Sequence, residues 1–355
     1  MTVNKPQNST IIDIISEGYR AINRRPLIIL IPLMLNLCMW CGVQVSLHPL
    51  IDAAVTFVQE APQPAISENQ AELTAQYDQF RSAGQWNMWQ SMAVLNFIPT
   101  LTIYSMGGDN AENQVIAAPP NMLVSIFLAS LSLPYPVPQL LNPQLATFEI
   151  NGLPLLLAAF IGINMVLLPA SAVFLTRLAV AVRQDQPHGM MWLQQAKKAS
   201  LSLLAYVGIA YGLGFALGIP FLFFTGVLLA VSPPLGGLVI GFLIVIIFWV
   251  SIYVGFTPEA IAVSGIGPLH AIRASFTIVQ RDFWSTLLFL ALIFLITAGT
   301  GLIWNAFATS SVGVIAAAIG SAYIGSGLWA ARMAFYREKL QRWHSTIPVP
   351  HPSPQ

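Results

Sequence analysis

The chain has 355 residues, of which 29 are charged (15 Lys and Arg plus 14 Asp and Glu) and 56% are hydrophobic. A soluble domain carries about 25% charged residues, whereas this chain carries 8% and has a mean hydropathy of +0.70. These values exclude a water-soluble globule, and the net charge of +1 without a basic block excludes a disordered chain and a nucleic-acid-binding protein. The composition predicts an all-α polytopic membrane protein.

Long apolar runs give the number of membrane spans. A bilayer core about 30 Å thick is crossed by about 20 apolar helical residues. Six runs reach this length, at 26–47, 153–182, 199–231, 236–256, 284–308 and 312–335. None contains an acidic residue, and the two basic residues, Arg177 and Arg332, lie near run ends. Continuous runs of this kind indicate helices, because a β-barrel has short alternating segments. The sequence therefore predicts six transmembrane helices.

Two further stretches, 86–106 and 121–133, leave the number of spans open. Polar residues such as Asn87 and Asn96 interrupt the first, and the second has 13 residues, too few to cross the bilayer untilted. We interpret both as interfacial or re-entrant. An eight-span arrangement, in which both cross the bilayer, would leave the two termini on the same side.

The basic residues predict the orientation of the chain. With six spans, the segments on the opposite side from the termini contain a single basic residue, Arg81. The other 14 fall on the side of the termini, and they are Lys5, Arg20, Arg24, Arg25, Arg177, Arg183, Lys197, Lys198, Arg273, Arg281, Arg332, Arg337, Lys339 and Arg342. Cytoplasmic segments carry the excess of Lys and Arg, so we expect both termini in the cytoplasm and a multi-pass protein of the bacterial plasma (inner) membrane.

Three cytoplasmic segments with apolar residues at helical spacing each precede a span. The first has Ile11, Ile15, Tyr19 and Ile22 on one face, and the third has Leu269, Ile272, Phe276, Val279 and Phe283. Thr10 and Asp13 form a capping pair at the start of the first segment. The second segment, 190–199, is shorter. We expect these helices to lie in the headgroup layer with their cationic residues near anionic lipid.

These elements predict a domain plan. A tail and an interfacial helix occupy 1–25, and a transmembrane domain occupies 26–344. That domain consists of three helical hairpins, each preceded by an interfacial helix. The first hairpin holds an external insert at 48–152, where we expect an amphipathic helix at 66–83 and the binding of a protein partner. The Pro-rich end, 345–355, is expected to be disordered.

Residue types that carry chemistry are scarce. Cys38 and Cys41 form a C-x-x-C motif, but reactive thiolates need a helix N-terminus or a nearby cation, so we interpret them as small hydrophobes. A membrane thiol oxidoreductase is the alternative. The five histidines do not cluster at metal-ligand spacing, and no hydrolase, zinc-protease or P-loop motif occurs. We therefore expect no catalytic residue, no metal, no cofactor and no enzymatic activity.

Small and polar residues within the runs are candidate contact sites. Gly212 belongs to one of two sets of glycines, in the third and the sixth runs, whose spacing favours close helix packing. The alternative is a flexible helix along a substrate path, broken at Pro220. Asn164 and Asn305 are amides at membrane depth, which we interpret as partners in interhelical hydrogen bonds. No ionisable residue lies in the middle of a run, which argues against a proton- or ion-coupled transporter.

Glu259 lies just after the fourth run and is within reach of Arg273 if the chain folds back. We interpret this pair as a structural clamp, with a lipid-headgroup or substrate site as the alternative. Arg281 is a further candidate for contact with lipid or substrate.

The segment 257–284 carries a family resemblance. An apolar run is followed by Pro and an Ala-Ile-Ala-Val sequence, then by a helix of the form A-x-R-x-S-x-x-x-V and by Phe-Trp. The matching positions are Pro258, Ala271, Arg273, Ser275, Val279, Phe283 and Trp284. This pattern resembles the repeated cytoplasmic segment of bacterial membrane proteins akin to the membrane domain of glycerophosphoryl diester phosphodiesterases. The resemblance implies a helical membrane module without catalytic residues, since the phosphodiesterase chemistry belongs to a separate soluble domain.

Two function classes follow from these observations. We expect a non-enzymatic membrane protein that acts as a scaffold, an accessory subunit or a lipid-interacting subunit of a membrane assembly. Its partners would be membrane lipids and a protein bound through the insert 48–152. The alternative is a permease for an apolar or lipidic substrate.

Overall fold

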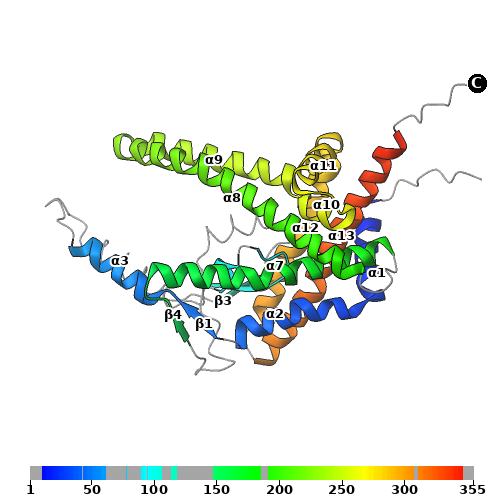
Figure 1. Cartoon of the computed structure of the whole chain (residues 1–355), viewed down its shortest axis with the longest axis horizontal. Helices are drawn as coiled ribbons and strands as arrows, with labels where there is room; N and C mark the ends of the chain where they lie inside the picture. The colour runs from blue at the N-terminus through cyan, green and yellow to red at the C-terminus, as the bar shows by residue number, and fades with distance from the viewer. Residues whose placement is uncertain are drawn as a thin grey trace, which may run out of the picture. The chain divides into compact units, whose positions relative to one another are not determined.

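The computed structural model describes residues 10–41, 43–60, 77, 89–93, 95–105, 113–117, 147–184, 191–307 and 311–346. Most of them are helical (Figure 1). The chain falls into two compact units. Unit 1 comprises Met1–Ile28, Ala172–Ile293 and Ser326–Gln355, and unit 2 comprises Ile29–Ser171 and Phe294–Gly325.

Five stretches of the described chain are long and apolar enough to cross a membrane. They are Leu153–Arg183, Met191–Leu229, Pro234–Ser264, Phe283–Trp304 and Val312–Trp343. A sixth exists only if α1 (Ile11–Arg24) and the following Pro26–Cys38, which meet at an angle of 93°, count as one bent span. The prediction of a helical, polytopic membrane protein is confirmed. The exact number of spans and the three-hairpin plan stay predictions.

The first predicted span, 26–47, is only partly helical. It divides into a 3₁₀ turn η1 (Pro26–Ile29), α2 (Leu30–Cys41) and a strand β1 (Gln44–Ser46). The 12 residues of α2 extend about 18 Å at a rise of about 1.5 Å per residue. This is less than the bilayer core of about 30 Å, so α2 alone is too short to be a span.

Unit 1 contains seven of the described helices in whole or in part, besides the end of α7. They are α1, α8 (Met191–Val231), α9 (Pro233–Val254), α10 (Thr257–Ser264), α11 (Pro268–Arg281), and parts of α12 (Phe283–Phe307) and α13 (Ser311–Thr346); α7 itself is Leu153–Arg183. Helices α8 and α9 form an antiparallel pair (Figure 1).

Helix α8 is continuous, which corrects one prediction and one alternative. The segment 190–199 is not a separate interfacial helix, because neither Gly nor Pro separates Met191 from the apolar run and the helix continues into it. Nor is the helix broken at Pro220, which lies inside α8. A proline removes a single backbone hydrogen bond, and helices within membranes tolerate this loss.

Helix α1 begins at the predicted capping box. The Thr10 backbone N–H and hydroxyl donate to Asp13 Oδ2 at 2.9 and 2.7 Å, and the Asp13 N–H donates to Thr10 Oγ1 at 3.2 Å. Its Gly18 faces α13 so closely that a Cβ atom there would lie 2.4 Å from the backbone nitrogen of Ala331. The ring of Tyr19 covers Gly327 of α13 in the same way. Close glycine packing therefore joins these two helices.

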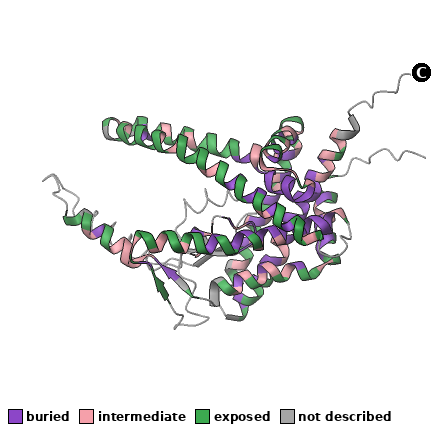
Figure 2. Ribbon diagram, viewed as in Figure 1, coloured by how far each residue is buried: buried purple, intermediate pink, exposed green. Residues whose placement is uncertain are grey.

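The interior of unit 1 is built from aromatic rings and small residues. Phe256, Phe289 and Phe335 are fully buried, and the rings of Phe289 and Phe335 lie 4.3 Å apart. In contrast, most of α8 and α9 is exposed (Figure 2). The expected close packing of the α8 glycines is wrong within the described chain, because a Cβ atom would meet nothing within 4 Å at any of Gly208, Gly212, Gly214 and Gly218.

The described residues of unit 2 include four short strands that the sequence did not predict. β1 pairs in parallel with β4 (Thr147–Glu149), with Gln44 opposite Thr147. β2 (Leu101–Ser105) pairs antiparallel with β3 (Asn113–Ala117), with Leu101 opposite Ala117. The helices α3 (His48–Glu60) and α5 (Trp89–Met92) also belong to this unit, together with α2 and parts of α7, α12 and α13.

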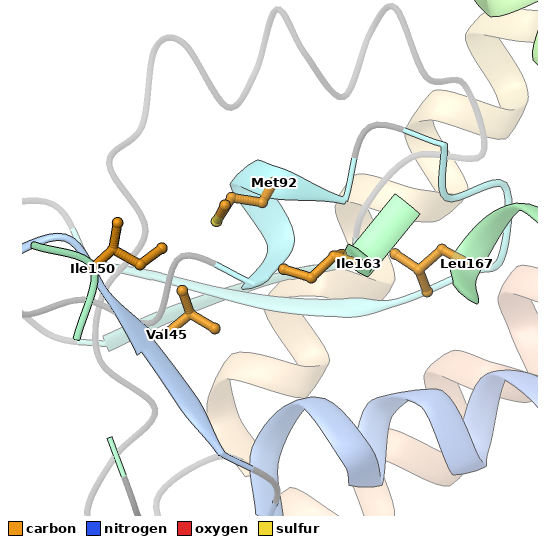
Figure 3. Packing of buried hydrophobic residues seen from close by; sticks show 5 residues of the cluster. All are labelled: Val45, Met92, Ile150, Ile163 and Leu167. Carbon is orange, nitrogen blue, oxygen red and sulfur yellow. The ribbon is translucent and has the colours of Figure 1, made fainter. Parts of the chain in front are cut away.

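A buried cluster anchors the ends of the insert 48–152 to α7. It consists of Val45 from β1, Met92 from α5, Ile150 next to β4, and Ile163 and Leu167 from α7 (Figure 3). The insert therefore begins and ends on the same core. The predicted helix at 66–83, except for Tyr77, and the stretch 121–133 lie outside the described residues.

Candidate functional site

In unit 1 the helix is interrupted between α9 and α10. Helix α9 ends at Val254 and α10 begins at Thr257, so Gly255 and Phe256 are not helical. Pro258 favours the interruption, because it has no N–H for the carbonyl of Val254, four residues earlier, and its ring crowds that carbonyl in a regular helix. An interruption leaves backbone N–H and C=O groups without intrahelical partners, and such groups are costly to bury in an apolar environment.

Two hydroxyl side chains form hydrogen bonds with backbone groups that the interruption leaves without helical partners. Ser275 of α11 accepts a hydrogen bond from the N–H of Phe256 at 3.1 Å and donates to the carbonyl of Tyr253 at 2.7 Å. Thr257 donates to the carbonyl of Val254 at 2.7 Å. In the sequence Ser275 stands out only through the family resemblance, and the structure gives it a physical role as the side chain that joins α11 to the end of α9.

A buried ion pair lies beside the interruption. Arg332 of α13 donates through Nε to Glu259 Oε1 and through Nη2 to the carbonyl of Gly255. The side chains of Glu259 and Arg332 are 0% and 1% exposed. The guanidinium also lies 5.1 Å from the ring centres of Phe256 and Trp329, a distance typical of cation–π contacts. A single arginine therefore joins α13 to both the end of α9 and α10.

The second carboxylate oxygen of Glu259 is different. Oε2 is buried and has no hydrogen-bond partner among the described residues. Tyr206 of α8 is also buried. The ion pair of Glu259 and Arg332 is thus neutral overall, and Glu259 Oε2 is an acceptor without a partner among the described residues. Within the described residues, no group of three His, Cys, Asp or Glu side chains could hold a metal ion.

Two further arginines bind helix ends in the same manner. Arg183 donates to the carbonyl of Val263 at 2.7 Å, in the last turn of α10. Arg337 donates to the carbonyl of Val182 in the last turn of α7 and forms an ion pair with Glu17 of α1 at 3.0 Å. Cationic side chains near a helix C-terminus satisfy its last carbonyls and complement its dipole. With Arg332, three arginines thus cap three helix ends in unit 1.

The predicted partner of Glu259 is wrong. Arg273 lies exposed on α11, and the ion pair of Glu259 is with Arg332 instead. The reason is that Ser275 and its neighbours occupy the face of α11 that packs inward, so Arg273 points away. Arg281, another candidate, lies with its guanidinium 5.0 Å from the ring centre of Trp343. The side chain of Asn305 lies outside the described residues.

Asn164 has the hydrogen-bonding role that its position predicted. In unit 2 its Oδ1 accepts from the N–H of Leu95 at 2.8 Å, and its Nδ2 donates to the carbonyl of Met92 at 2.7 Å. Ser171 lies on the same face of α7, and its hydroxyl accepts a hydrogen bond from the N–H of Phe97 at 3.0 Å. The partners are α5 and the irregular buried segment after it rather than a long helix. Non-helical backbone in an apolar setting needs such side-chain partners.

The C-x-x-C motif lies at the end of a helix that does not activate a thiol. Cys38 is free and exposed, and the motif forms the last turn of α2. Reactive pairs are activated at a helix N-terminus, which is the opposite end. The side chain of Cys41 lies outside the described residues.

Two sequence signals could have identified the Glu259–Arg332 pair. Arg332 is a basic residue within an apolar run, and Glu259 is an acidic residue close to the end of another. Charges at such positions are expected to pair with each other. Arg183 and Arg337 had no comparable signal, because basic residues at the cytoplasmic ends of spans are common.

No protein family, characterised protein or solved structure matches this chain. Its function must therefore be inferred from the site itself.

Proposed function

We propose that this chain is a non-enzymatic scaffold or accessory subunit of a membrane assembly in the bacterial plasma membrane. The observation that carries this proposal is the Glu259–Arg332 ion pair. Both side chains are removed from solvent, and the arginine binds two neighbouring helical segments at once. Breaking such a pair is strongly destabilising, so this arrangement suits a fixed helix framework better than a site that opens for a substrate.

The remaining polar groups near this pair support the same proposal. Arg183, Arg337 and Ser275 are all bound to backbone groups of other helices. These hydrogen bonds leave fewer donors for a substrate, and Glu259 Oε2 is the acceptor of the ion pair that has no partner among the described residues. The distribution of the basic residues supports cytoplasmic termini, and the amphipathic helices α1 and α11 would then lie on the cytoplasmic side in contact with lipid.

A permease for an apolar or lipidic substrate is the second candidate. It is favoured by the interruption between α9 and α10, because transporters often bind substrates at discontinuous helices. The open space beside Gly212 also favours it. Against it, the side chains of Ser275, Thr257 and Arg332 already satisfy the backbone at the interruption. The scaffold is therefore the better-supported candidate, and a thiol oxidoreductase ranks third because of the position of Cys38.

The resemblance of 257–284 to the membrane domain of glycerophosphoryl diester phosphodiesterases fits the same proposal. The matching residue Ser275 binds the backbone of α9, and the matching residue Val279 is buried. The resembling segment would thus be a packing module, with no catalytic part in the phosphodiesterase reaction.

Reconstitution separates the two main candidates. The purified protein in liposomes should move fluorescent phospholipid no faster than empty vesicles. Photo-cross-linkers placed in α3, within the insert 48–152, should capture one partner in constant proportion in native membranes. Lipid movement that Gly212→Leu abolishes and Gly299→Leu preserves would support the permease and contradict the scaffold. Both glycines have open space around them, so neither variant is expected to misfold.

A further inference from the structure

Helix α11 has one face fixed against unit 1. Ala271, Ser275, Ile278 and Val279 are buried, and the helix packs against α8, α9 and α10. The two hydrogen bonds of Ser275 to the end of α9 fix the rotation of α11 about its own axis. The opposite face is therefore presented outward in a defined orientation.

The outward face combines apolar and cationic side chains. Leu269 and Phe276 are 58% and 47% exposed, although the ring of Phe276 also stacks on that of Tyr253 of α9 at 4.9 Å. Exposed Arg273 lies between them in the same stripe, at spacings of four and three residues. Large exposed apolar residues beside cations are typical of helices that lie at a membrane surface, where the apolar side chains enter the acyl boundary.

The positive charge of this face has no counter-charge on the described residues around it. Helix α11 contains Arg273 and Arg281 and no acidic residue. The adjacent Asp282 is in an ion pair with Lys339 at 3.3 Å. Neither arginine forms an ion pair with a carboxylate of the described residues, in contrast to Arg332 and Arg337. The face therefore carries two positive charges that lack an intramolecular counter-charge in the described part of the chain.

Arg281 is oriented by an aromatic ring. Its guanidinium lies over Trp343 at 5.0 Å from the ring centre. Such a contact uses the flat face of the guanidinium, while the N–H donors point along its plane. Those donors match the oxygen atoms of a phosphate group, which arginine binds through two parallel hydrogen bonds.

We propose that the outward face of α11 binds the phosphate headgroups of anionic phospholipid. Arg273 and Arg281 contact the phosphate, and Leu269 and Phe276 enter the lipid beside it. This inference rests on the proposed membrane-scaffold function and names the lipid class that it takes. A second copy of the chain is a poorer occupant, because pairing through the same face would bring the like charges together.

The test compares two variants that lose the same charge. Arg273→Gln/Arg281→Gln changes the proposed site, and Lys197→Gln/Lys198→Gln removes two exposed cations from α8. Each protein is reconstituted in bilayers of phosphatidylcholine with phosphatidylglycerol, extracted gently, and its bound phosphatidylglycerol is counted by native mass spectrometry. We expect the α11 variant to bind phosphatidylglycerol roughly tenfold less tightly or weaker. The α8 variant should lose clearly less, because the compact ammonium groups of Lys197 and Lys198 lack the planar donors that bind a phosphate through two hydrogen bonds.

Two further measurements separate the guanidinium group from charge alone and lipid from free phosphate. Arg273→Lys/Arg281→Lys keeps the charge without the planar donors and should give intermediate affinity. Inorganic phosphate added in solution should not displace the lipid, since it lacks the apolar contact with Leu269 and Phe276.

Three results would overturn the proposal. They are unchanged lipid binding by the α11 variant, an equal loss in the α8 variant, and a protein cross-linked to α11 in place of phosphatidylglycerol. Phospholipid movement by the unaltered protein would contradict the scaffold function while leaving lipid binding at α11 measurable. The two failures are therefore distinguishable.

Discussion

Replacement of Arg332 by Met should destabilise the protein more than any other single change in the ion pair. The substitution leaves the carboxylate of Glu259, which is 0% exposed, without its counter-charge, at a cost of about 3–5 kcal/mol. It also removes the hydrogen bond to the carbonyl of Gly255, which adds about 1–3 kcal/mol for a buried unpaired acceptor. The combined loss of about 4–8 kcal/mol is comparable with the whole stability of a domain, about 5–15 kcal/mol.

The double variant Glu259→Gln/Arg332→Met gives the sharper test. It contains no buried charge, so it should be more stable than Arg332→Met alone although it carries one more substitution. The free energy of unfolding is measured by reversible titration with a denaturing detergent, followed by tryptophan fluorescence. Arg342→Met is the matched control on the same helix, because its ion pair with Glu338 is partly exposed and should contribute about 1 kcal/mol or less.

A double variant at least as unstable as the sum of its single variants would refute this reasoning. It would mean that the two side chains do not interact energetically in the folded protein, and that Glu259 and Arg332 act separately on the backbone.

Three further changes have expected outcomes. Gly18→Leu should detach α1 from α13, at a cost of about 1–3 kcal/mol or more, and raise the rate at which protease cleaves α1, whereas Gly212→Leu, in open space, should not. Asn164→Leu should leave two buried backbone groups unpaired, at about 1–3 kcal/mol each, and lower the unfolding midpoint further than Thr225→Ala, whose hydroxyl bonds only within its own helix. The hydrogen bond from the N-cap hydroxyl lowers the pKa of Asp13 below its ordinary value of 3.8. The ionised Asp13 carboxylate therefore stabilises the folded state above pH 3.8. This contribution is lost as the pH falls through the lowered pKa of the folded state. Asp13→Asn should remove that pH dependence from the NMR amide shifts of α1.

Features that depend on neighbouring residues could be predicted from the sequence. The capping box of Thr10 and Asp13 involves residues three positions apart, and the structure has all three of its hydrogen bonds. The long apolar runs predicted α7, α9 and α12 closely, because the length and apolar character of a span are local properties.

Features that depend on contacts between distant parts of the chain could not be predicted from the sequence. Arg332 and Glu259 are 73 positions apart, and no periodicity in the chain indicates which charge near one span meets which charge near another. Ser275 belongs to a short motif in the sequence, and its role becomes evident only with its partners on α9. The sequence predicts a helix where strand β1 lies because its apolar residues continue the preceding run, and its partner β4 lies on the far side of the insert 48–152.

The interruption between α9 and α10 also bears on the order in which the protein can assemble. The carbonyl of Gly255 and the carboxylate of Glu259 are synthesised 77 and 73 residues before Arg332, which binds both. At about 5–20 residues per second, this is a delay of about 4–15 s. During that time the end of α9 lacks its final partner, so α13 completes a junction whose other parts were synthesised well before it. Truncation before Arg332 should therefore leave an insertion intermediate, with an uncompensated acidic residue, that membrane quality control would recognise.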